Sequence, residues 1–167
     1  MRLETAFVVG LSVLVLAMSA CGGDDSDGGD QAGGGGQETL SRQEVIARGD
    51  TLCKEFREDT ERLLNRADRI TDPKQQAEIL HRVADRGKEV ADEFDSFDPP
   101  PADARIIDRY VSVSREQLTL LRRAADSLEQ GDAQEAGTLL DSGQGKGAEL
   151  RGIAQGYGFK VCGSERD

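Results

Sequence analysis

The chain has 167 residues but few of the side chains on which catalytic and ligand-binding sites often depend. It contains no Trp, one His, three Cys, two Tyr and five Phe. Because His81 is the only imidazole, a di-iron bundle site with two Glu-x-x-His motifs is excluded, and no Ser-His-Asp arrangement is supported. The lack of Trp argues against the aromatic platform of a carbohydrate-binding protein.

Basic residues are also fewer than acidic residues. The chain carries 32 Asp and Glu against 21 Lys and Arg, and residues 38–167 hold 27 of these acids and 20 of these bases. A surplus of seven acids leaves no basic face for a phosphate backbone, so we expect no nucleic-acid partner. The length suits one folded domain better than a large multidomain enzyme.

Residues 1–20 have the pattern of an export signal. Positive charge at the N-terminus precedes a 13-residue apolar run from Ala6 to Met18. Such a run fits the core of a signal peptide and is shorter than the roughly 20 residues that a membrane-spanning helix needs.

The run ends in Met18-Ser19-Ala20-Cys21, which resembles the lipobox of bacterial lipoproteins, with Met18 where Leu is usual. The resemblance implies that Cys21 becomes the first residue of the mature chain and carries acyl chains. An ordinary signal peptide followed by a chance cysteine is the alternative.

Residues 21–37 contain 8 Gly, 4 Asp and no basic residue. Nothing in 22–37 is suited to a core, so a flexible tether is predicted between the lipidated cysteine and a domain at 38–167. The run Asp25-Ser26-Asp27-Gly28 lacks the later acids and the terminal Glu of an EF-hand loop, so a calcium site is not expected here.

From residue 38 onward, apolar residues recur every three or four positions, which is typical of helices and not of strands. Four helices are expected, over 41–70, 72–97, 101–130 and 132–157. Short connections make consecutive helices antiparallel, so the predicted fold class is all-α, an up-down-up-down four-helix bundle. The core is expected to include Val45, Leu52, Phe56, Ala84, Phe94, Ile107, Leu118, Leu121, Ala136, Ala154 and Tyr157.

Local signals place the helix ends. Ser41 and Glu44 have the spacing of a capping box, Asp72 caps the second helix with Pro73 in its first turn, and Asp132 with Glu135 opens the fourth helix. Three prolines at 99–101 end that helix, because proline donates no backbone hydrogen bond. Gly131 ends the third helix.

The helix at 132–157 is interrupted by several glycines, each of which costs about 1 kcal/mol relative to Ala in a helix interior. Two outcomes are open: the helix breaks near 143–147, or its small side chains allow a close approach to the helix at 41–70. The i,i+4 pair Gly143 and Gly147 favours the close approach.

The cysteines favour one disulfide. With Cys21 lipidated, Cys53 and Cys162 remain, an even number for an oxidising compartment. If the first and last helices are antiparallel neighbours, the tail after Tyr157 can fold back along the first helix, with Phe159 and Val161 covering the end of the bundle. We therefore predict a Cys53–Cys162 disulfide.

Other motifs carry less weight. Glu78 and His81 form a single Glu-x-x-His, and His81 is expected on the surface. The run Gly143-Gln144-Gly145-Lys146-Gly147 lacks the first glycine and the Ser or Thr of a phosphate-binding loop. We therefore predict no catalytic residue, no cofactor and no metal ligand.

The region from about residue 50 to 163 resembles a group of small helical, secreted or lipid-anchored proteins of actinobacteria. The features that carry the resemblance are a Cys in the first helix, three prolines before a helix with Tyr110, and the closing Gly156-Tyr157-Gly158-Phe159-Lys160-Val161-Cys162-Gly163. The resemblance implies an envelope location and a helical fold, and it brings no known activity.

These patterns predict a lipoprotein outside the cytoplasm, anchored to the cell membrane through Cys21. Its domain at 38–167 is expected to be a non-enzymatic binding or structural module of the envelope, with an envelope protein or a small ligand as partner. The alternative is a bundle that binds a small molecule, a metal or haem through His81 and neighbouring carboxylates.

Overall fold

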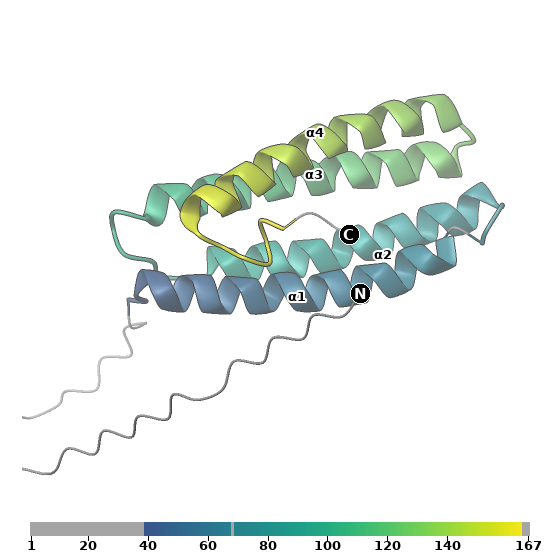
Figure 1. Cartoon of the computed structure of the whole chain (residues 1–167). Helices are drawn as coiled ribbons and strands as arrows, with labels where there is room; N and C mark the ends of the chain where they lie inside the picture. Colours follow the sequence, from purple (N-terminus) through teal and green to yellow (C-terminus); the bar gives the residue numbers. More distant parts are fainter. Residues whose placement is uncertain (1–38, 68, 165–167) are drawn as a thin grey trace, which may run out of the picture. The chain divides into compact units, whose positions relative to one another are not determined.

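A computed structural model describes residues 39–67 and 69–164. In these ranges the chain forms four helices and no strand: α1 (Arg42–Ala67), α2 (Pro73–Asp95), α3 (Ala104–Glu129) and α4 (Ala133–Tyr157) (Figure 1). Because the described residues form helices and no strand, the predicted all-α fold class is confirmed. Consecutive helices run antiparallel. None of the described helices is long and apolar enough to cross a membrane.

Side chains at the predicted positions cap the helices. The Ser41 backbone N–H donates to the Glu44 carboxylate at 2.8 Å, and the Glu44 N–H donates to the Ser41 hydroxyl at 3.3 Å. Hydrogen bonds from Ser41 lower the pKa of Glu44. Asp72 and Asp132 each accept a backbone N–H from the first turn of α2 and α4. These bonds satisfy donors that are free at a helix start, so the boundaries are set locally.

The start of α3 differs, because its capping residue has another role. Asp103 precedes the helix but makes no side-chain cap hydrogen bond. Its carboxylate is buried and accepts a hydrogen bond from the Tyr157 hydroxyl of α4 at 3.1 Å. The Arg42 guanidinium of α1 lies 3.6 Å from the same carboxylate and stacks over the Tyr157 ring. Asp103 therefore joins three helices at one end of the bundle.

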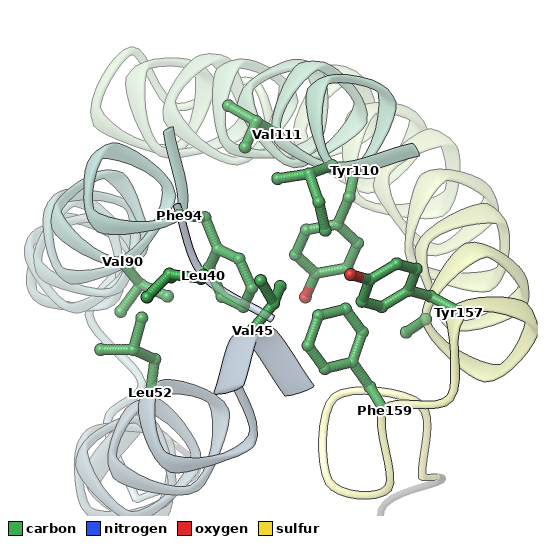
Figure 2. Close-up of a cluster of buried hydrophobic side chains, with 11 residues drawn as sticks. Leu40, Val45, Leu52, Val90, Phe94, Tyr110, Val111, Tyr157 and Phe159 are labelled. Atoms are coloured by element: carbon green, nitrogen blue, oxygen red, sulfur yellow. The ribbon is translucent and has the colours of Figure 1, made fainter. Parts of the chain in front are cut away.

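The large core side chains gather at that same end, where α1 and α3 begin and α2 and α4 end. Figure 2 shows Phe94, Tyr110, Tyr157 and Phe159 pointing toward one another between the helices. The Phe94 ring centroid lies 4.9 Å from that of Tyr110 and 5.8 Å from that of Phe159. Tilted and edge-on contacts of this kind add to the free energy gained by burial. Aliphatic residues surround the rings: Leu40, Val45, Leu52, Val90, Ile107, Val111 and Ala154.

Small side chains are common among the other buried residues of the bundle, beside Ile79, Val83 and Val113. Gly87 of α2 is buried directly against the Leu118 side chain of α3. Alanines, whose small side chains allow helix axes to approach, are buried on three helices: Ala77 and Ala84 on α2, Ala124 and Ala125 on α3, and Ala136 on α4.

The packing of helix α4 differs from the sequence-based expectation. It is continuous from Ala133 to Tyr157, but it packs along α3, and no Cα atom of α4 lies within 8 Å of one in α1. A Cβ at Gly147 would meet Gln117 of α3, and one at Gly143 would meet nothing within 4 Å. The predicted close approach to the first helix is therefore wrong. Residues 158–164 run beside α1 instead and lie between it and α4 (Figure 1).

We predict that Gly49→Ala destabilises the bundle by up to about 2 kcal/mol. A Cβ there would lie 2.8 Å from the Phe94 ring and would also meet Phe159. Overpacking of this kind costs about 1–3 kcal/mol, and the gain of about 1 kcal/mol in helix propensity offsets only part of a cost near the upper end of that range, which the contact with two buried rings favours. Urea unfolding followed by circular dichroism measures the difference.

Gly152→Ala is the matched control. Gly152 lies inside α4, and a Cβ there would meet nothing within 4 Å. The gain in helix propensity should raise the free energy of unfolding by about 0.5–1 kcal/mol. Equal shifts in the two variants would contradict the packing described for Gly49.

Candidate functional site

The structure places Cys53 of α1 and Cys162 beyond α4 at disulfide distance, as the sequence predicts. The bond joins residues 109 positions apart, with a Cα–Cα distance of 5.2 Å. Gly158 ends α4 with a φ of 112°, a left-handed conformation that favours glycine, and so turns the chain back toward α1. We call residues 158–164 the C-terminal clasp, because they connect the last helix to the first.

Side chains of α1 before and after Cys53 form hydrogen bonds with the clasp. The Asp50 carboxylate accepts the backbone N–H groups of Lys160, Val161 and Cys162, the shortest at 2.7 Å. Arg57 donates to the Val161 carbonyl at 2.8 Å. Sequence reasoning missed Asp50 and Arg57, although both lie within about one turn of Cys53 and so share its side of α1.

Two buried tyrosine hydroxyls lie near the clasp. Burial and then the charge of Asp50 raise the pKa of Tyr110 to about 12, and the Tyr110 hydroxyl lies 3.6 Å from Cys53 Sγ. Burial and then the hydrogen bond to Asp103 raise the pKa of Tyr157 to about 12. Both hydroxyls therefore stay protonated near neutral pH, and the Tyr157 hydroxyl donates its proton to the hydrogen bond with Asp103.

His81 lies on α2 and faces two carboxylates of α3. Its Nε2 atom is 3.5 Å from Asp126 Oδ1 and 3.5 Å from Glu129 Oε1. One ligand atom of each residue lies within 4.8 Å of the other two, and Glu78 is not part of this group. The structure thus groups His81 with carboxylates that the Glu-x-x-His motif does not contain.

A groove of about 580 Å³ lies between the start of α1 and the end of α2. Leu40, Leu52 and Phe97 supply apolar surface, and Arg48 supplies one positive charge. Three acids outnumber that arginine: Glu44, Glu93 and Asp98. The groove therefore favours a ligand that combines apolar surface with positive charge. His81 does not line it.

The groove lies beside the segment that precedes α1. Thr39 and Leu40 line it, and the Leu40 backbone N–H donates to the Asp98 carbonyl at 2.7 Å. The Thr39 hydroxyl donates to the Asp98 carboxylate at 2.9 Å. The segment that enters α1 is thus attached to the connection between α2 and α3.

The expected lipidation site, Cys21, and the tether lie outside the described residues. Comparison with protein families, with curated proteins and with solved structures finds no match to the chain. The expected lack of enzymatic activity stays a prediction.

We predict that reduction of the Cys53–Cys162 bond lowers the free energy of unfolding by about 4–5 kcal/mol. In the chain-entropy model, a bond that closes a loop of about 100 residues restricts mainly the unfolded chain. Helix content at low denaturant should not change. Urea unfolding with and without reductant, followed by circular dichroism, measures the effect.

Mass spectrometry of the non-reduced, alkylated protein supplies the control for this experiment. It should find neither Cys53 nor Cys162 alkylated before reduction and both alkylated afterwards. Free thiols at both positions in protein recovered from an oxidising compartment would contradict the disulfide, and equal stability in the two redox states would contradict its contribution.

Proposed function

We propose that this chain is an extracytoplasmic lipoprotein whose helical domain is a non-enzymatic binding module held at the membrane through Cys21. The observation that carries the proposal is the clasp disulfide, because such bonds persist mainly in oxidising compartments. A lipobox-like sequence at the end of an export signal supports the same location.

The groove between α1 and α2 supports the binding role. It is lined by Thr39 and Leu40, which lie just before α1, and so lies at the end of the domain that follows the proposed tether in the sequence. A Gly-rich tether of 16 residues has a root-mean-square span of roughly 20–25 Å. A ligand bound in the groove would therefore be held near the membrane surface.

The side chains that line the groove limit the chemical class of ligand that it would bind. Its acids outnumber its single arginine by two, and its apolar residues lie beside them. A basic, partly apolar segment of an envelope protein fits these features better than an acidic ligand does, because like charges across an interface are unfavourable.

Cys21→Ser is expected to abolish lipidation. Only a cysteine thiol accepts the diacylglyceryl group of a lipoprotein, and durable anchoring needs more than one acyl chain, at about 0.8 kcal/mol per buried CH₂. The variant should accumulate as uncleaved or mis-sorted precursor. Membrane fractionation and mass spectrometry of the N-terminal peptide would show the change.

Cys53→Ser is a control for the loss of a thiol, since it removes the disulfide and leaves the lipobox intact. It should still be acylated at Cys21 and fractionate with membranes. Recovery of Cys21→Ser as a mature-sized, acylated membrane protein would contradict the proposed anchor.

We predict that a photoreactive residue at Thr51 cross-links to a binding partner in intact cells. Thr51 is exposed and lines the groove. Thr138, which is exposed on α4, is the matched control and should give little or no product. Glu93→Lys should reduce the Thr51 product, because it reverses a charge inside the groove. Identical products at both positions, or none at Thr51, would contradict the groove as the binding surface.

A further inference from the structure

Two helices bring one imidazole and two carboxylates together on the surface of the bundle. His81 comes from α2, and Asp126 and Glu129 are one turn apart on α3. None of the three lies in the groove or the clasp. Among the described residues, one basic side chain, His81, lies within 4.0 Å of the Asp126 carboxylate, and the same is true of the Glu129 carboxylate.

The distances suit a shared ion better than direct hydrogen bonds. The two N···O separations of 3.5 Å are longer than the 2.7–3.2 Å of ordinary N–H···O bonds. A tetrahedral ion about 2.1 Å from each donor places neighbouring donors roughly 3.4 Å apart. The distances from His81 Nε2 to Asp126 and to Glu129 therefore already match the spacing of such donors. The two carboxylate oxygens lie within 4.8 Å of each other.

Exposure and charge permit the ion to enter. The exposed fractions of the His81, Asp126 and Glu129 side chains are 32%, 56% and 49%, so the carboxylates rotate freely enough to close on an ion without rearranging the core. Their two negative charges balance a divalent cation, and three protein ligands leave at least one position for water or an external ligand.

The geometry points to a surface site for a divalent first-row transition metal, represented by Zn²⁺, at His81, Asp126 and Glu129. An imidazole nitrogen with two carboxylate oxygens suits such ions, whereas Ca²⁺ and Mg²⁺ prefer all-oxygen ligand sets. This site goes beyond the proposed lipoprotein function and does not depend on it. A protonated His81 that only forms ion pairs with the two acids is the competing arrangement.

The test is a calorimetric titration of the untagged full chain, stripped of metal, with ZnCl₂. One equivalent should bind, and excess Ca²⁺ or Mg²⁺ should not displace it. Loss of a ligand should weaken binding at least about 10-fold, so His81→Ala, Asp126→Asn and Glu129→Gln should each show this change. All three side chains are partly or largely exposed, so circular dichroism of the metal-free variants should match the parent.

Glu78→Gln is the matched control. Glu78 is exposed and lies three residues before His81, but it is not part of the group. Its replacement should leave Zn²⁺ affinity unchanged. The visible absorption of bound Co²⁺ supplies a second readout, which should disappear in Glu129→Gln and persist in Glu78→Gln.

Three results would overturn the site. They are the absence of a saturable equivalent of Zn²⁺, equal weakening by Glu78→Gln and Glu129→Gln, or affinity that survives His81→Ala. Any of them would leave the ion-pair arrangement as the account of these contacts.

Discussion

The attachment of the C-terminal clasp to α1 is the constraint on which the rest of the bundle depends. The helices pack in chain order, α1 on α2, α2 on α3 and α3 on α4, and the Cα atoms of α1 and α4 stay more than 8 Å apart. The disulfide, the three N–H bonds to Asp50 and the bond from Arg57 bring the end of the chain against its first helix. Phe159 is thereby fixed between α1 and the aromatic rings of α2 and α3.

The clasp lies at the end of the bundle where the aromatic core residues gather, and its Phe159 is one of them. Leu40 enters the same cluster from the other terminus, and Asp103 connects Arg42 with Tyr157 beside it. Away from the clasp, the buried residues of α2 and α3 are mainly alanines and Gly87, together with Ile79, Val83 and Val113. One end of the bundle thus combines aromatic packing with a covalent linkage, whereas the rest is packed from small and aliphatic side chains.

The two candidate binding features are far enough apart to be tested independently. Glu93 of the groove and His81 lie 12 residues apart on α2, which corresponds to about 18 Å along the helix. A change at one of them should not alter the ligand chemistry of the other. The groove offers charge and apolar surface to a partner, whereas the His81 group offers ligand atoms to an ion.

The sequence by itself determined the helices and most of the residues they bury. The three-and-four spacing marked Val45, Phe94, Ile107 and Tyr157, and the capping residues at 41, 72 and 132 marked three of the four starts, because these signals act within a few residues. The number of cysteines also predicted the disulfide between Cys53 and Cys162.

The tertiary structure decided how the last helix relates to the first, and which carboxylates face His81. The glycines of α4 suggested a close approach to α1, but small side chains permit contact with any neighbour and do not select one. The Glu-x-x-His spacing suggested Glu78 as the companion of His81, whereas the companions come from α3. Both outcomes depend on how whole helices pack side by side, and that packing is set by contacts between residues far apart in the chain.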